Sequence, residues 1–213
     1  MKLHNRTMWL VVVAMFTAII FLLAFTPIGF IPLPFMRATT IHIPVIVGSL
    51  LLGPKAGGVL GFMFGLTSLI NNSINPNPTS FVFSPFYNLP GQESGSWLSL
   101  IIVFVPRILV GITPWFASQG LKKIMHERLM PINWALSGIV GSLTNTLLVM
   151  HLIFLLFGED WNSVRQGTTA IYAAILSIIA INGVPEAVIA GVLVAALMGA
   201  LTATIKAQGL QVR

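Results

Sequence analysis

Two charged side chains lie inside long apolar runs of this sequence. Arg107 occurs in SLIIVFVPRILVGITPWF, and Glu186 occurs in INGVPEAVIAGVLVAALMG. A charge at membrane depth is costly and normally faces a polar cavity, a partner or a ligand. A guanidinium matches a carboxylate or a phosphate with two parallel hydrogen bonds, so Arg107 is a candidate contact for an anion. The alternative is a structural ion pair between Arg107 and Glu186, and the sequence leaves both readings open.

Three further polar residues occur in the apolar segments. Asn145 and His151 belong to one segment, while Asn182 precedes Glu186 by four residues, which places both on one face of a continuous helix. An asparagine amide offers a donor and an acceptor to a ligand that carries hydroxyl or amide groups. The same groups also serve as hydrogen bonds between membrane helices. We treat all three, together with Arg107 and Glu186, as candidate substrate contacts.

The longest irregular segment covers residues 74–97 and is rich in Asn, Pro, Ser and Gly. Long loops often act as lids or binding loops. Its aromatic side chains suit either an apolar cover over a site that opens outward or an anchor at the membrane surface. These side chains are Phe81, Phe83, Phe86 and Tyr87. Tyr87 and the neighbouring Asn88 are therefore included among the candidate substrate contacts.

The composition is that of an integral membrane protein. Hydrophobic residues make up 56% of the 213 positions and charged residues 8%, whereas soluble domains carry about 25% charged residues. The net charge of +6 comes from basic residues scattered at the ends of the apolar runs, which favours membrane topology over nucleic-acid binding. The sequence contains no cysteine and no Walker phosphate loop, zinc-protease motif or paired intramembrane carboxylates. We therefore expect no catalytic residue, metal site or cofactor in this chain.

The apolar runs predict one membrane domain, residues 1–213, with six spans. The expected spans are approximately 8–26, 38–53, 57–73, 98–117, 132–157 and 183–205. The first loop, TPIGFIPLPFM, is expected to be a stiff second gate because of its prolines. A short helix around 169–181 is expected before the last span, separated from it by NGVP. The distribution of Lys and Arg places both termini in the cytoplasm, so the predicted fold is an all-α bundle of six transmembrane helices.

Small residues recur four positions apart on three of the expected spans, and such stripes let helices approach closely in lipid. Ala14 and Ala18 form the pair on the first span, where ordinary packing within the bundle is the alternative to docking of another protein. The other two stripes are expected to be internal packing seams. They comprise Gly57, Gly61 and Gly65 on the third span, and Gly191, Ala195 and Gly199 on the sixth.

The chain resembles the substrate-binding S components of energy-coupling factor (ECF) vitamin transporters. The resemblance covers residues from about 8 to 205 and includes the size, the six-span plan and the AxxxA motif from Ala14 to Ala18. Its most specific part is TTIHIPVIVGSLLLGPKAGGVLGFMFGLTSLI followed by SFVFSPF, which is similar to the branch that includes pantothenate carriers. The late NGVPE also suits that branch.

The resemblance implies a subunit of the prokaryotic plasma membrane that captures a vitamin outside and releases it inside. It also implies docking through Ala14 and Ala18 on a membrane coupling subunit, with two cytoplasmic ATPases that bind ATP. Pantothenate is the expected vitamin, since its carboxylate suits Arg107 and its hydroxyls suit the asparagines. The alternatives are the same architecture carrying hydroxymethylpyrimidine, pyridoxine or another vitamin precursor, and a small membrane-embedded enzyme.

Overall fold

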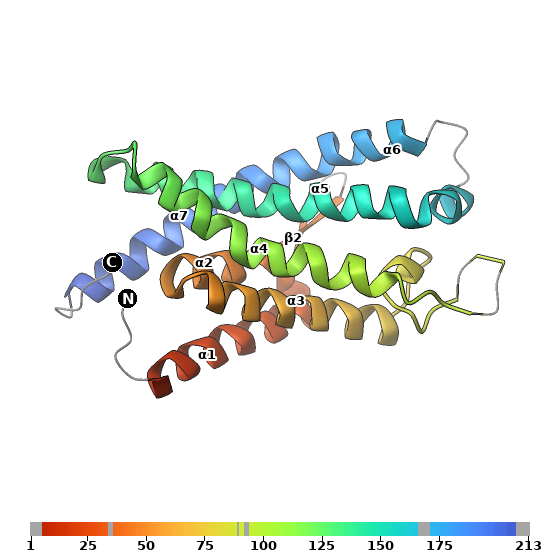
Figure 1. Cartoon of the computed structure of the whole chain (residues 1–213), viewed down its shortest axis with the longest axis horizontal. Helices are drawn as coiled ribbons and strands as arrows, with labels where there is room; N and C mark the ends of the chain where they lie inside the picture. Colours follow the sequence, from red (N-terminus) through yellow and green to blue (C-terminus); the bar gives the residue numbers. More distant parts are fainter. Residues whose placement is uncertain (1–5, 34–35, 89, 92–93, 166–170, 208–213) are drawn as a thin grey trace.

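The computed structural model describes residues 6–33, 36–88, 90–91, 94–165 and 171–207. They form an elongated helical bundle in which α4 and α5 run along most of the length (Figure 1). The helices are α1 (Arg6–Ala24), α2 (His42–Leu52), α3 (Pro54–Ile74), α4 (Ser99–Lys122), α5 (Met130–Arg165), α6 (Ile171–Ile178) and α7 (Val184–Ala207). Figure 1 shows that α1 begins and α7 ends at the same end of the bundle, which we call the terminal end.

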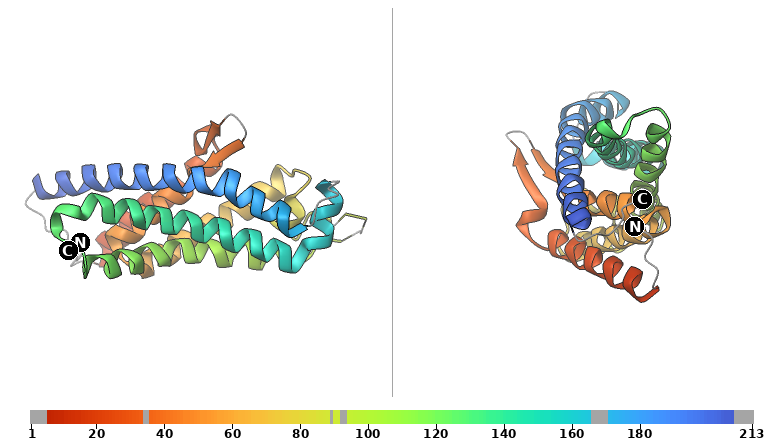
Figure 2. Two further views of the ribbon diagram at one scale, coloured as in Figure 1. Left: turned by 90° about the horizontal axis from the view of Figure 1, so that it is seen from above. Right: turned by 90° about the vertical axis from the view of Figure 1, so that its left-hand side faces the viewer.

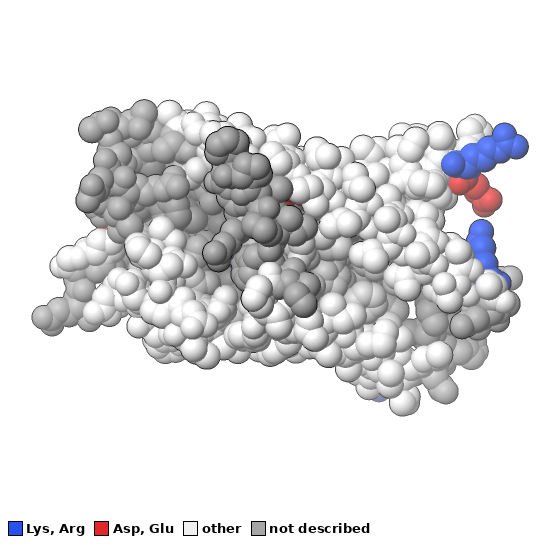
Figure 3. All heavy atoms as spheres, turned by 180° about the vertical axis from the view of Figure 1, so that it is seen from behind, with Lys and Arg blue, Asp and Glu red and all other residues white. Residues whose placement is uncertain are grey.

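The surface has the character of a membrane protein. Four helical segments are long and apolar enough to cross a membrane, by length and composition: Arg6–Ala24, Ser99–Lys122, Glu127–Asp160 and Ile175–Ala207. Seen from behind, charged side chains gather at the terminal end and are almost absent from the middle of this face (Figure 3). A broad uncharged band of this kind is what the hydrocarbon part of a bilayer requires.

The region of the second expected span, 38–53, departs from the prediction. The helix α2 covers only His42–Leu52, and its 11 residues span about 16 Å, roughly half the thickness of a bilayer core. Before it, β1 (Phe30–Leu33) and β2 (Met36–Thr39) form an antiparallel hairpin, so the fold is not purely helical. Figure 2 shows this hairpin projecting from the side of the bundle next to α7. The expected stiff loop is therefore a hairpin, whose short strands satisfy each other's backbone groups.

The predicted break before the last span is also wrong. The helix α6 continues into α7 through a π-helical stretch, Ile179–Gly183, which joins them into one long helix. Pro185 lacks a backbone N–H and would clash with a carbonyl four residues earlier in a regular α-helix. A π-helical turn relieves such a clash by widening the helix locally. The fifth span breaks at its predicted end, residue 157: a kink at Phe157 (φ −140°, ψ 23°) separates it from the helical segment that continues α5 to Arg165.

Close backbone packing joins α3 to α4, as the third-span glycines predicted. A Cβ added at Gly57 would lie 1.8 Å from the Gly111 carbonyl oxygen, and one at Gly61 would lie 2.2 Å from the Arg107 carbonyl oxygen. Gly65 of α3 faces Phe104 of α4, and an added Cβ at Gly65 would lie 2.9 Å from the Phe104 ring. Such approaches exclude any larger residue, so this stripe is an internal packing seam.

The stripe on α7 behaves differently along its length. Gly191 packs on α5, where an added Cβ would lie 3.0 Å from the Ala135 carbonyl oxygen. An added Cβ at Gly199 would meet nothing within 4 Å, so the predicted seam does not extend to this residue. Figure 1 shows the reason: towards the terminal end α7 diverges from the neighbouring ends of α4 and α5.

Two buried apolar clusters hold the bundle together. The first joins α1, α2, α3, α4 and α7 and includes Phe16, Ile20, Ile46, Leu60 and Val110. The second joins the segment after α3 to α4 and α5, and its members are Phe81, Val82, Ile102, Val149, Ile153 and Phe157. Each cluster contributes one side chain, Phe64 and Val149 respectively, to the lining of the polar cavity described next.

Candidate ligand-binding cavity

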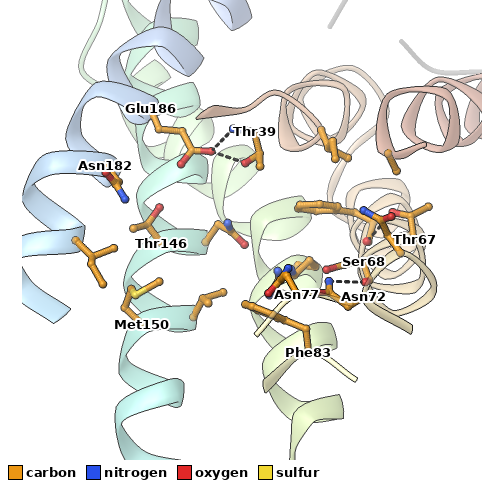
Figure 4. Close-up of a pocket in the computed structure, with 18 of the residues that line it drawn as sticks. Thr39, Thr67, Ser68, Asn72, Asn77, Phe83, Thr146, Met150, Asn182 and Glu186 are labelled. Carbon is orange, nitrogen blue, oxygen red and sulfur yellow. Dashed lines mark hydrogen bonds between the residues drawn. The ribbon is translucent and has the colours of Figure 1, made fainter. Parts of the chain in front are cut away.

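A cavity of about 560 Å³ lies among the hairpin, α3, α4, α5 and the junction of α6 with α7. Its apolar border includes Phe64 of the first cluster and Val149 of the second. Its polar lining combines one guanidinium, one carboxylate, several amides and several hydroxyls. These groups belong to Arg107, Glu186, Asn71, Asn72, Asn75, Asn77, Asn145, Asn182, Thr39, Thr67, Ser68 and Thr146. Figure 4 shows Asn182, Thr146 and Met150 on one side, with Thr67, Ser68 and Asn72 opposite.

Arg107 is the cation of this cavity and is 7% exposed. Its Cζ lies 5.6 Å from the ring centre of Phe64 and 5.3 Å from that of Phe83, so two aromatic faces hold the guanidinium. Nη1 donates a hydrogen bond of 2.7 Å to the Ile102 carbonyl oxygen, while Nε is buried without a partner. A buried donor with no partner is rare in native proteins, and a ligand anion would satisfy it.

Glu186 lies in the first turn of α7 and is held by the hairpin rather than by Arg107. Its Oε1 accepts hydrogen bonds from Thr39 N (3.2 Å) and Thr39 Oγ1 (2.5 Å), which Figure 4 shows as dashed lines. The same oxygen lies 3.7 Å from His42 Nδ1. His42 is 1% exposed, and neither of its ring nitrogens has a hydrogen-bond partner, so Glu186 is the nearest polar partner of this buried imidazole.

The two intramembrane charges are therefore not paired with each other. Among the described residues, the Glu186 carboxylate has Thr39 and His42 as partners, while Arg107 has the Ile102 carbonyl. The ion pair that the sequence left open is absent from this arrangement. Each charge remains a separate feature of the cavity wall.

A row of asparagines on α3 is the part of the cavity that the sequence analysis missed. Asn71 and Asn75 line the cavity from the last turns of α3, and Asn72 joins them on the same side. Asn72 Oδ1 accepts a hydrogen bond of 2.9 Å from Ser80 Oγ, which ties the following segment to the helix. The signal was present in the sequence, because Thr67, Asn71 and Asn75 recur every four residues. The expected third span contained Thr67 and Asn71 but gave them no role, and the expected loop 74–97 took Asn75 out of the helical pattern.

Asn145 and Asn182 also line the cavity, from α5 and from the π-helical stretch. The Oδ1 of Asn145 is buried and has no hydrogen-bond partner, so it is an acceptor available to a ligand. Asn182 lies on the same side as Glu186 in Figure 4, four residues before it in a continuous helix. The cavity thus brings Arg107, Asn145, Asn182 and Glu186 together.

Three of the candidate contacts do not line this cavity. His151 lies one turn beyond Leu147 on α5, where its Nδ1 is 2.7 Å from the Leu147 carbonyl oxygen and its ring meets Tyr172 of α6. Tyr87 packs against the second apolar cluster. With Asn88 it also borders a separate hollow of about 380 Å³ in the segment between α3 and α4. His151 misses the cavity because the rotation of α5 turns its side chain toward α6. Tyr87 misses it because its ring packs against the second apolar cluster.

The expected aromatic cover is only partly present. Phe83 lines the cavity, whereas Phe81 is fully buried in the second cluster. Phe86 is 71% exposed and stacks edge-on with Trp97, which fits an anchor at the membrane surface.

Ala14 and Ala18 lie on the exposed side of α1, next to Met15 and Ile19, which are 57% and 40% exposed. The buried side of the same helix carries Phe16 and Ile20 instead. The pair is therefore not an internal packing contact, and this face of α1 is open to lipid or to another protein.

Comparison with known proteins places the chain in a family. The model of the family described as ECF transporter, substrate-specific component matches residues 9–198. The pantothenic acid transporter PanT of Lactococcus lactis subsp. cremoris is 40% identical over 171 residues, which cover 80% of each chain. The pantothenate transporter PanT of Leuconostoc mesenteroides subsp. mesenteroides is 26% identical over 220 residues, or 98% of each chain. The chain therefore belongs to the substrate-specific components of ECF transporters, which are transport subunits rather than enzymes, and is a multi-pass protein of the prokaryotic plasma membrane.

Proposed function

We propose that this chain binds pantothenate in the cavity around Arg107 and supplies it to an ECF transporter. The observation that carries the proposal is the buried guanidinium of Arg107, whose Nε has no hydrogen-bond partner and which shares the cavity lining with several asparagine amides. Pantothenate carries one carboxylate, one amide and two hydroxyls. The carboxylate suits the guanidinium, and the other groups suit the asparagines. The names of the two similar transporters support the same vitamin.

The size and lining of the cavity support a small flexible acid over an aromatic vitamin. A volume of about 560 Å³ lies within the range of about 300–1,000 Å³ that is usual for small-molecule sites. The aromatic side chains of the lining are Phe64 and Phe83, and both rings already lie against Arg107. Hydroxymethylpyrimidine and pyridoxine would gain little from stacking here and would leave the guanidinium without an anion.

We also infer the membrane topology and the partners. In this topology the chain crosses six times, the hairpin and α2 together form the second crossing, and both termini lie in the cytoplasm. The common position of the start of α1 and the end of α7 supports it, as does the charge gathered there (Figures 1 and 3). The exposed pair Ala14 and Ala18 is a suitable surface for a membrane coupling subunit, because small residues allow close helix contact. Two cytoplasmic ATPases supply the energy.

Isothermal titration of the purified chain against a vitamin panel tests the substrate. We expect pantothenate to bind with sub-millimolar affinity or better, and pyridoxine and hydroxymethylpyrimidine to give no heat at the same concentrations. Absence of pantothenate binding below millimolar concentration would overturn the assignment. Copurification of the tagged chain from its native membrane tests the partners, and the proposal requires a coupling protein with two ATPases in the eluate.

A further inference from the structure

The contacts of Thr39 determine which atoms of Glu186 remain available to a ligand. Thr39 ends β2 and is opposite Phe30 in the hairpin, so the ladder fixes its backbone. Its N–H and its hydroxyl both donate to the same oxygen, Glu186 Oε1. The other oxygen, Oε2, has no hydrogen-bond partner among the described residues. One residue of the hairpin thus orients a carboxylate whose second oxygen is unoccupied.

An oriented carboxylate in a cavity accepts hydrogen bonds and repels other anions. A ligand hydroxyl is a suitable donor to Glu186 Oε2, whereas a ligand carboxylate beside it would be repelled by the like charge. The guanidinium of Arg107 lies elsewhere on the wall, between Phe64 and Phe83. The two charges therefore favour one direction of a ligand that has an acid at one end and hydroxyls at the other.

We propose that Thr39 is a positioning residue that holds Glu186 as the acceptor for a ligand hydroxyl, so that the ligand acid faces Arg107. This inference rests on the proposed function and adds to it the direction in which pantothenate lies. It also gives the hairpin a direct part in specificity, because β2 carries Thr39.

A double-mutant cycle between protein and ligand tests this role. Pantothenate and an analogue that lacks its terminal hydroxyl are titrated against the wild type, Thr39→Val and Thr39→Ser. We expect Thr39→Val to lower the affinity for pantothenate about tenfold, the usual effect of one charge-assisted hydrogen bond. The affinity for the analogue should fall less than twofold. Thr39→Ser should restore wild-type affinity. Thr26→Val is the matched control, because that hydroxyl bonds to the Leu22 carbonyl within α1 and does not line the cavity.

Equal losses for both ligands in Thr39→Val would overturn the inference while leaving the proposed function intact. A wild type that does not bind pantothenate would instead overturn the proposed function. An infrared measurement without ligand then decides the role of Thr39. The carboxylate stretch that disappears in Glu186→Gln should shift in Thr39→Val, and an unshifted band would show that Thr39 does not hold this carboxylate.

A second observation concerns the terminal end and is independent of the vitamin site. Where α7 diverges from α4 and α5, a cavity of about 590 Å³ opens between their ends. Two lysines border it, Lys122 from the end of α4 and Lys206 from the end of α7. Within the described ranges neither lysine makes an ion pair, although Glu127 borders the same cavity.

The rest of this lining is apolar and adaptable. Leu50, Trp134 and three methionines form most of it, and Thr202 Oγ1 is buried there without a hydrogen-bond partner. Methionine side chains adapt to irregular apolar chains, and basic pockets between membrane helices bind anionic lipid headgroups. We infer that this cavity holds an anionic phospholipid, with its phosphate between Lys122 and Lys206 and an acyl chain along the apolar wall.

Native mass spectrometry tests this lipid site on the whole chain purified with equal amounts of phosphatidylglycerol and phosphatidylcholine. We expect retained adducts of phosphatidylglycerol, reduced at least fivefold in Lys122→Gln/Lys206→Gln. Lys123→Gln is the control, because Lys123 neighbours Lys122 and is exposed outside the cavity. Unchanged adducts in the double variant, or an equal loss in Lys123→Gln, would overturn the site. Displacement of the lipid by millimolar inorganic phosphate would assign it to free phosphate instead.

Discussion

Replacement of Arg107 by alanine is the most direct test of the vitamin site. The guanidinium is 7% exposed, is held between Phe64 and Phe83, and has one hydrogen bond, to the Ile102 carbonyl. Its Nε is the donor that a bound carboxylate would use. Removal of the side chain therefore leaves a buried ligand anion without its cation.

The size of the effect follows from the burial of this group. Removal of one partner of a buried, hydrogen-bonded charge pair costs about 2–5 kcal/mol. At about 1.4 kcal/mol for each factor of ten, the dissociation constant for pantothenate should rise roughly 30- to 4,000-fold. Arg107→Lys should lie between the wild type and Arg107→Ala, because it keeps the charge but loses the planar fork.

Isothermal titration with two ligands separates this effect from misfolding. Pantothenol, in which an alcohol replaces the carboxylate, should bind the wild type weakly. Its affinity should fall less than threefold in Arg107→Ala. Thermal unfolding of each variant in detergent confirms that the protein under test is folded. Unchanged affinity for pantothenate in a folded Arg107→Ala protein, or equal losses for both ligands, would refute the assignment of Arg107 to the acid group.

Three further predictions concern packing and docking. Ala14→Trp and Ala18→Trp should abolish uptake into proteoliposomes that contain the complete transporter, while the affinity of the chain for pantothenate stays unchanged. A parallel loss of affinity would show that the pair supports the vitamin-binding cavity instead of docking. Gly57→Ala should lower the free energy of unfolding by about 1–3 kcal/mol or more, because the added Cβ would meet a backbone carbonyl oxygen at 1.8 Å. Gly199→Ala is the control and should be neutral or stabilising, since an added Cβ there meets nothing within 4 Å. Thermal unfolding of the two variants measures the difference. Ser80→Ala should lower the free energy of unfolding by about 1–2 kcal/mol and weaken pantothenate binding, because it releases the segment after α3 from Asn72. Wild-type values in thermal unfolding and in isothermal titration would contradict this.

The hydropathy pattern predicted most of the helices, but not the region before α3. The run from Phe30 to Leu52 is mostly apolar, with Arg37, Thr39, Thr40 and His42 at its centre, so hydropathy alone does not separate a strand pair from a helix. The pairing of Phe30 with Thr39 is local, but Pro32 lies inside β1, and a proline within a run argues against a strand. Pro185 was interpreted as a boundary, whereas a π-helical turn accommodates it within one long helix.

The site was harder to predict, because it depends on the rotation of each helix about its axis. The cost of burying charge pointed to Arg107 and Glu186 without any knowledge of that rotation. His151 belongs to the same helix as Asn145, but six residues correspond to a rotation of more than one and a half turns, which carries it to the side facing α6. Thr39 has no sequence signal of its own, since its role depends on a contact across 147 residues.

The glycine contacts between α3 and α4 have a consequence for the thermodynamics of binding. Backbones that touch directly, as at Gly57 and Gly111, leave no side chain to repack, so α3 and α4 form one rigid unit. This unit carries both Arg107 and the asparagine row. The groups proposed to bind the acid are therefore preorganised, and we expect little loss of conformational entropy there when a ligand enters. We expect any ordering on binding to involve the hairpin and the π-helical junction, which line the cavity from the side of Thr39 and Asn182.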